Sequence, residues 1–173
     1  MRFTSIAATA VITLGTSVPA IAQESSVVLK QSGATLEITS YKASFEPETR
    51  ATSYSRGNLD QVSHSVTYKN VSSKEVVALQ IGLTSFDAFN GFMGRFNGWS
   101  TERIGVGESK TGTWSQRTYA AFAFKGYGTG VAYVNAVRFS DGSIWRANLT
   151  EVLIELQKFE KELKREDLVD PKK

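Results

Sequence analysis

The stretch that decides the fold of this sequence is VSHSVTYK, residues 62–69. Its side chains alternate: Val62, His64, Val66 and Tyr68 fall on one side, and serine, threonine and lysine fall on the other. In a β-strand, successive side chains point to opposite faces of the sheet. The stretch therefore predicts a strand with one buried face and one face in water, which is typical of an antiparallel sheet.

The same two-residue period returns on both sides of this strand. Upstream, Leu36 and Ile38 alternate with polar residues, and downstream the apolar residues of 77–83 follow the polar turn 70–75. We expect the strands 62–69 and 77–83 to pair as a hairpin. Repeated short strands separated by turn residues predict a mainly β protein, built as an antiparallel β-sandwich.

A second hairpin is predicted closer to the C-terminus. Residues 131–139 and 144–147 are apolar runs on either side of SDGS, residues 140–143. Asp-Gly favours a tight type I′ turn because both residues tolerate a positive φ. With that turn, Arg138 would lie opposite Trp145, where the guanidinium could cover the indole ring.

From Asn148 onward the sequence has the period of a helix. Apolar residues spaced three and four apart form one stripe, and Asn148 can cap the first turn with Glu151 completing a capping box. We predict an amphipathic C-terminal helix over 148–166 and a charged tail over 167–173. The stripe has two open roles, packing on the sandwich or contact with a second subunit or partner. The partner contacts would be Val152, Leu156, Phe159 and Leu163.

Residues 1–22 have the three parts of a secretory signal peptide in order. Arg2 supplies the positive charge, an apolar stretch too short to span a bilayer follows, and Ala20-Ile21-Ala22 gives the small-x-small cleavage pattern. We predict cleavage after Ala22 and a sandwich domain over 23–147. The product is expected in the periplasm or the medium, without membrane insertion after cleavage.

The amino-acid composition excludes several functional classes. The chain has no cysteine, so it forms no disulfide, thiolate metal site or cysteine nucleophile. Its 20 basic and 17 acidic residues give a net charge of +3, which becomes about +2 once Arg2 is removed. This balance gives no electrostatic reason to expect nucleic-acid binding.

Groups suited to catalysis are sparse. His64 is the single histidine and lies on the apolar face of its strand. We predict a buried, hydrogen-bonded imidazole there, and no catalytic residue, metal or cofactor. The loop carboxylates Asp87 and Glu102 leave a hydrolase open, which would need a concave site and a carboxyl group of raised pKa.

A segment rich in aromatic residues and glycine, residues 86–99, is the strongest candidate for a ligand site. It contains four phenylalanines, a methionine, a tryptophan and three glycines, and it repeats Phe-Asn-Gly. A second such run covers 119–133. Glycine beside aromatic residues lets loops display rings that stack on a sugar or grip an apolar side chain; the alternative is that these rings form the core. If displayed, the ligand-binding residues at one end of the sandwich would be Phe89, Phe92, Arg95, Phe96, Trp99 and Tyr127.

Three motifs resemble the small immunoglobulin-like β-sandwich domains of exported bacterial proteins. They are VTYKNVSSKEVVAL (66–79), the GES turn (107–109) that leads to Trp114, and VRFSDGSIW (137–145). The resemblance covers roughly residues 60–147 and implies a fold without supplying active-site residues.

These observations predict an immunoglobulin-like sandwich with a C-terminal helix, acting as an exported, non-enzymatic binding or assembly module. Either a protein or a glycan would suit it as partner. Two alternatives remain: a small secreted hydrolase that uses loop carboxylates, and a structural homodimer formed through the C-terminal helix.

Overall fold

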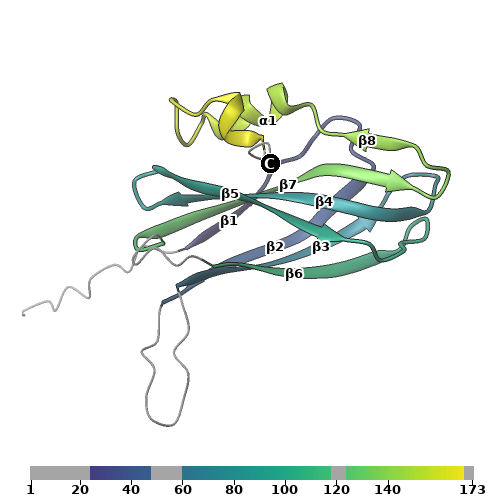
Figure 1. The fold of residues 1–173 in the computed structure, drawn as a ribbon, viewed down its shortest axis with the longest axis horizontal. Coiled ribbons are helices and arrows are strands. Elements are labelled where there is room, and N and C mark those ends of the chain that lie inside the picture. The colour runs from purple at the N-terminus through teal and green to yellow at the C-terminus, as the bar shows by residue number, and fades with distance from the viewer. Residues whose placement is uncertain (1–23, 48–59, 118–123, 170–173) are drawn as a thin grey trace, which may run out of the picture.

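Two β-sheets lie face to face in the computed structural model of this protein, which describes residues 24–47, 60–117 and 124–169 (Figure 1). The larger sheet has the strand order β1-β7-β4-β5, with β8 paired to β7, and the smaller sheet has the order β2-β3-β6. The prediction of a mainly β protein is confirmed. The strands are β1 (Ser25–Val28), β2 (Leu36–Glu46), β3 (Gln61–Asn70), β4 (Val76–Asp87), β5 (Phe92–Ser100), β6 (Ser109–Arg117), β7 (Tyr127–Phe139) and β8 (Ile144–Arg146).

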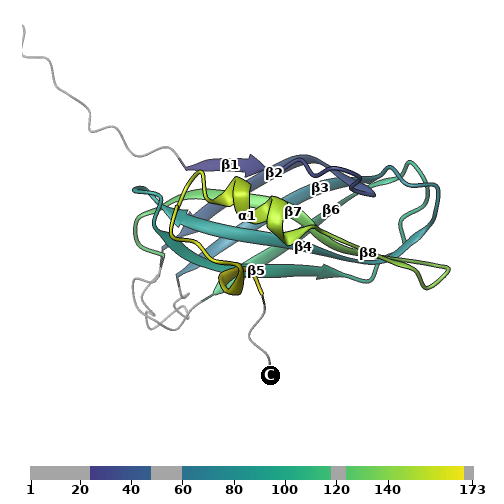
Figure 2. The same cartoon turned by 90° about the horizontal axis from the view of Figure 1, so that it is seen from above.

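A third, thin layer covers part of the outer face of the larger sheet. It consists of the helix α1 (Leu149–Leu156) and the short 3-10 helix η1 (Arg165–Leu168). Seen from above, α1 lies over β7 (Figure 2). Within the described residues, no helix is long and apolar enough to cross a membrane.

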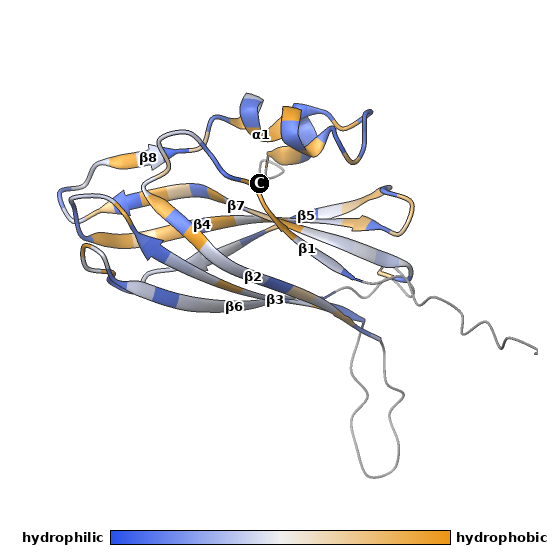
Figure 3. Ribbon diagram, turned by 180° about the vertical axis from the view of Figure 1, so that it is seen from behind, coloured by the Kyte–Doolittle hydropathy of each residue, from blue (hydrophilic) through white to orange (hydrophobic). Residues whose placement is uncertain are grey.

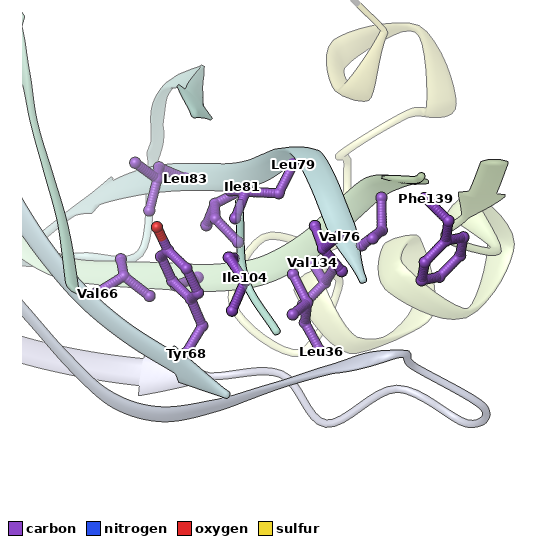
Figure 4. Close-up of a cluster of buried hydrophobic side chains, with 12 residues drawn as sticks. Leu36, Val66, Tyr68, Val76, Leu79, Ile81, Leu83, Ile104, Val134 and Phe139 are labelled. Carbon is purple, nitrogen blue, oxygen red and sulfur yellow. The ribbon is translucent and has the colours of Figure 1, made fainter. Parts of the chain in front are cut away.

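Apolar side chains from both sheets fill the space between them (Figure 4). β3 buries Val62, His64, Val66 and Tyr68, as its alternation predicts. The cluster drawn in Figure 4 joins the smaller sheet to the larger one, with Ile104 from the segment before β6. Its labelled members are Leu36, Val66, Tyr68, Val76, Leu79, Ile81, Leu83, Ile104, Val134 and Phe139.

β4 is buried on both faces, since the smaller sheet covers one and the layer containing α1 covers the other. In Figure 3 it carries more hydrophobic residues than β6, which is an edge strand of the smaller sheet. Residues of β4 thus divide into two sets. Leu79, Ile81, Leu83 and Ser85 face the smaller sheet, and Gln80, Gly82, Thr84 and Phe86 face outward.

The predicted hairpin between 62–69 and 77–83 is wrong. β3 and β4 belong to different sheets, and the turn between them carries the chain across the sandwich. Asn70 fixes this crossing because its Nδ2 donates to the carbonyl oxygens of Lys74 (2.8 Å) and Ile104 (3.1 Å). The two apolar faces therefore meet across the core instead of lying side by side in one sheet.

The β7–β8 hairpin forms, but its predicted register is wrong by one residue. Arg138 lies opposite Ile144, and Trp145 lies opposite Val137. Gly142 adopts a positive φ of 85° whereas Asp141 does not, and a type I′ turn requires positive φ at both positions. The longer loop removes the expected stacking of Arg138 on Trp145, and the indole packs against the core instead.

One strand pair departs from the predicted antiparallel arrangement. β1 runs parallel to β7, with Ser25 opposite Thr129 and Val28 opposite Ala132. A parallel pair cannot be closed by a tight turn, and here nearly the whole domain separates the two strands. The other strand pairs of the two sheets are antiparallel.

The C-terminal helix begins where the sequence predicts and ends ten residues early, at Leu156 rather than 166. Asn148 caps it, since its Oδ1 accepts from the Thr150 N–H (3.1 Å). Glu151 does not complete a capping box, because it accepts from the Asn148 side chain instead. After the helix the chain folds back and returns Leu163 and Leu168 to the cluster under α1, which a straight helix of about 28 Å would not allow.

The predicted partner contacts on the helix stripe are covered by the chain itself. Val152, Leu156 and Leu163 are at most 3% exposed and pack on the outer face of the larger sheet, and Phe159 stacks on Phe86 (5.1 Å between ring centroids). Packing on the sandwich is therefore confirmed as the role of this stripe. The alternative use of these four residues as a partner surface is wrong, because the sheet occupies them.

Three predicted segments fall wholly or partly outside the described residues, and one is the aromatic run 119–133, of which residues 119–123 are not described. The signal peptide, 1–22, and its cleavage point lie outside them. Of the charged tail 167–173, only residues 167–169 are described. Leu168 is 1% exposed there, so the beginning of the tail is packed.

Candidate functional site

The six residues predicted to bind ligand do not form one aromatic patch. Phe89 is 93% exposed in the turn before β5, and Trp99 is 66% exposed near the other end of that strand. They are ten positions apart in the sequence, which places them more than about 20 Å apart along the strand. The predicted patch at one end of the sandwich is therefore wrong.

The other aromatic members of the predicted site pack inside the fold. Phe92 packs edge-on against Phe86 (6.1 Å between centroids). Phe96 packs against the main core and stacks on His64 (6.5 Å). Tyr127 is buried between the sheets. Their alternative interpretation as core residues is the one that the structure supports.

Arg95 and Trp99 come together in a depression on the outer face of the larger sheet. The depression has a volume of about 320 Å³ and lies between β5, the β8–α1 connection and η1. A neighbouring depression of about 210 Å³ shares Trp99 and Arg146 with it and extends to Arg138. We call this continuous surface the Trp99 trough; its principal lining residues are Gln80, Arg95, Trp99, Asn135, Arg138 and Arg146.

Packing within the sheet positions Arg95. Gly82 has no side chain, so the Tyr133 ring lies across β4 at that point and its hydroxyl reaches β5. There it accepts a hydrogen bond from Arg95 Nε (2.8 Å), while the Arg95 guanidinium also donates to Asn97 Oδ1 (2.7 Å). The guanidinium is thus held in place before any ligand arrives.

A bulge in β7 positions Asn135, one of the two amide groups of the trough. The register between β4 and β7 shifts at Asn135, whose Nδ2 donates to Gln80 Oε1 (2.9 Å). On the opposite wall, the Trp114 indole N–H donates to the backbone oxygen of Trp99 (3.0 Å) and holds that part of β5. This hydrogen bond therefore holds the backbone that carries the exposed Trp99 ring.

The trough is lined by basic residues. A third depression continues from Arg138 to Arg103. Among the described residues, no aspartate or glutamate lines any of the three depressions. Arg103 pairs with Glu75 (2.8 Å), whereas neither Arg138 nor Arg146 forms an ion pair within the described part of the chain. Clustered guanidinium groups produce a positive potential that favours an anionic ligand.

The structure separates the two carboxylates considered for a hydrolase. Asp87 lies before the β4–β5 turn, where its Oδ1 accepts from the N–H groups of Phe89 and Gly91 (both 2.8 Å). Glu102 follows the far end of β5. Where the pKa of a carboxyl group in the described part of the chain is shifted, it is lowered: a hydrogen bond from Ser63 lowers the pKa of Glu46, one from the Gly105 N–H lowers that of Glu108, and one from Lys74 lowers that of Asp141. Asp87 and Glu102 therefore do not form the carboxylate pair that the hydrolase alternative needs.

His64 is a buried, hydrogen-bonded imidazole, as predicted. It is 2% exposed, stacks between Tyr41 and Phe96, and its Nδ1 lies 3.0 Å from the Tyr41 hydroxyl. Burial lowers its pKa to about 4, so the ring is neutral at pH 7. Among the described residues, no three histidine, aspartate or glutamate side chains gather in a way that could hold a metal ion.

Sequence reasoning selected Arg95 and Trp99 and missed the rest of the trough. Gln80, Asn135 and Arg146 come from three strands, and the bulge at Asn135 breaks the alternation that would assign faces. The one usable signal was the pair Arg138 and Arg146 on either side of the Asp-Gly loop. Their side chains were assigned no role together because the predicted hairpin register was wrong.

Comparison with known proteins adds no family. No protein-family model and no curated protein matches this chain. Among solved structures, a hypothetical protein from Peptoclostridium difficile 630 is 13% identical, with a TM-score of 0.49 over 79% of this chain and 97% of its own. The structural genomics target SoR45 is 14% identical, with a TM-score of 0.42 over 65% of this chain and 80% of its own.

Proposed function

We propose that this protein is an exported, non-enzymatic binding module of the cell envelope or extracellular space, and that it holds an acidic glycan in the Trp99 trough. The observation that carries this proposal is the exposed Trp99 ring, which lines one depression together with Arg95 and Arg146. The export part is supported by the signal-peptide pattern of residues 1–22. An immunoglobulin-like form of the sandwich is part of the same proposal, supported by the three sequence motifs and the two-sheet architecture.

The chemistry of the trough suits a sugar that carries carboxylate groups. Arginine donates paired hydrogen bonds to carboxylates, and the face of an indole ring stacks on the apolar face of a sugar. The amides of Gln80 and Asn135 add groups that exchange hydrogen bonds with hydroxyls. An acidic protein segment would satisfy the arginines and would leave the exposed indole face and the amides with less to bind.

The test measures the affinity of the mature chain for two ligands by isothermal titration calorimetry. One ligand is a galacturonic acid oligomer, and the other is a neutral galactose oligomer of equal length. We expect the acidic oligomers to bind and the neutral ones to bind at least tenfold more weakly. Trp99→Ala and Arg146→Gln should each weaken binding by about tenfold, the loss expected for one charge-assisted or aromatic contact.

Two controls separate this site from general charge attraction. Phe89→Ala removes the other strongly exposed aromatic ring and should leave the affinity unchanged. A single-stranded oligonucleotide of equal charge should bind weakly and independently of Trp99. Equal binding of both polyanions, or none of the acidic oligomer, would overturn the proposal, and binding of an acidic peptide alone would favour a protein partner.

A further inference from the structure

The floor of the Trp99 trough follows the outer face of β4. Residues that pair directly across two strands share a face, so the strand register orders the trough residues in levels along β4. Three such levels are given by the pairs Arg95–Thr84, Trp99–Gln80 and Arg138–Ala78. The first and the last level are six positions apart on β4, which corresponds to about 20 Å of strand. The trough is therefore long enough for a chain of several sugars.

One end of the trough is closed. Leu168 and Val169 line the same depression as Arg95, and η1 contacts β5 there. Past the Arg95 level, the next outward residue of β4 is Phe86, which is fully buried because Phe159 stacks on it. The layer formed by α1 and η1 therefore covers β4 from this level onward and ends the trough.

The other end of the trough is open. Arg138 of β7 and Ile144 of β8 lie opposite each other there, and both are exposed. The surface continues past Arg138 to Gly142, at the tip of the β7–β8 hairpin. Figure 2 shows this hairpin extending away from α1. A chain bound in the trough can therefore continue past Arg138, whereas η1 blocks its path beyond Arg95.

We propose that the Trp99 trough binds the end of an acidic glycan chain, with the terminal sugar beside Arg95 and the following sugars passing Trp99 and Arg138. This inference rests on the function proposed above and specifies which part of the glycan is bound. Guanidinium groups at successive levels suit carboxylates that repeat along a chain, and the indole ring between them suits stacking on a sugar. The middle of a long polymer does not fit, because it would have to continue through η1.

The number of protein molecules bound per glycan chain tests this inference. Isothermal titration calorimetry compares a galacturonic acid hexamer with polygalacturonic acid of known chain concentration. We expect one protein per chain for both, because a longer chain has no additional end of the same kind. Several proteins on each long chain, lost with Trp99→Ala, would overturn end binding and leave the proposed function standing. Failure of both ligands to bind would overturn the proposed function as well.

A variant at the open end tests the direction in which the trough fills. Arg138→Gln should weaken binding of the hexamer by about tenfold, the loss expected for one charge-assisted contact. It should leave binding of a galacturonic acid dimer unchanged, because a dimer at the closed end does not reach a level about 20 Å away. Arg117→Gln is the matched control, since it removes the same charge from β6 of the smaller sheet and should affect neither ligand. Equal weakening of dimer and hexamer by Arg138→Gln would overturn the inference.

Discussion

The tripeptide Phe-Asn-Gly occurs at 89–91 and again at 96–98, and the two copies have different structures. The first copy forms the turn between β4 and β5, where Asn90 adopts a positive φ of 67° and the Phe89 ring lies in solvent. Asp87 stabilises this turn by accepting two backbone hydrogen bonds. The first copy is thus shaped by a residue two positions before it.

The second copy lies inside β5 and is extended. Phe96 points into the core and stacks on His64, while Asn97 is 7% exposed and accepts from Arg95. Gly98 lies under the Trp114 ring of β6. Contacts from other strands shape this copy, so the comparison shows that the same three residues form a turn or a strand according to what surrounds them.

The largest effect is expected where the second copy meets Trp114. A Cβ added at Gly98 would lie 2.5 Å from the indole ring, so Gly98→Ala should lower the free energy of unfolding by more than about 3 kcal/mol. Urea unfolding measures this. Gly105→Ala is the control, because its added Cβ would meet Glu108 at 3.4 Å, an ordinary contact. Similar losses in the free energy of unfolding for the two variants would mean that the Trp114 ring does not pack tightly against Gly98.

Acid should weaken the second copy through His64, which stacks on Phe96. The pKa of His64 is about 4 in the folded chain and 6.5 in the unfolded chain, so the unfolded state binds the proton first as the pH falls. The neutral imidazole therefore contributes about 3 kcal/mol to the free energy of unfolding. This contribution is fully present above pH 6.5 and is lost between pH 6.5 and about 4.

Unfolding free energies measured between pH 7 and 4.5 should show this loss. This pH window lies above the range in which the folded protein's carboxyl groups with lowered pKa values titrate. His64→Gln should be less stable at pH 7 and should lose most of the dependence on pH in this window. A wild-type protein with constant stability from pH 7 to 4.5 would contradict burial of a neutral imidazole.

The smallest effect is expected at the first copy. Phe89→Ser should change the free energy of unfolding by less than about 0.5 kcal/mol, because the ring is 93% exposed and contributes no packing. Thermal unfolding of this variant beside wild type checks it. A loss above about 1 kcal/mol would mean that Phe89 packs on a part of the molecule in solution.

Features set by neighbours in the chain were predictable from the sequence. The buried face of β3 follows from strict alternation, and the start of α1 follows from Asn148, which needs only the next helical turn to act as a cap. Features set by distant contacts were not. The end of α1 at Leu156 is one of these, because the chain folds back there and Leu163 packs in the same cluster as Val152 and Leu156.

Only part of the Trp99 trough could be predicted from the sequence, because the rest of it also depends on contacts between distant residues. Arg95 and Trp99 share β5 and could be recognised together as part of an unusual segment. Asn135 and Arg146 join them only because β7 bulges and β8 pairs with it in a register that the Asp-Gly motif did not predict. Backbone irregularities of this kind leave little trace in the pattern of apolar residues.

The parallel pairing of β1 with β7 has a consequence for the order of folding. β7 also pairs with β4 and β8, so the larger sheet lacks its central strand until residues 127–139 have been synthesised. Ser25 then finds Thr129, 104 positions away, late in the process. Contacts of such sequence separation close slowly. The larger sheet should therefore form only late in synthesis, a property that would suit the export proposed for this protein.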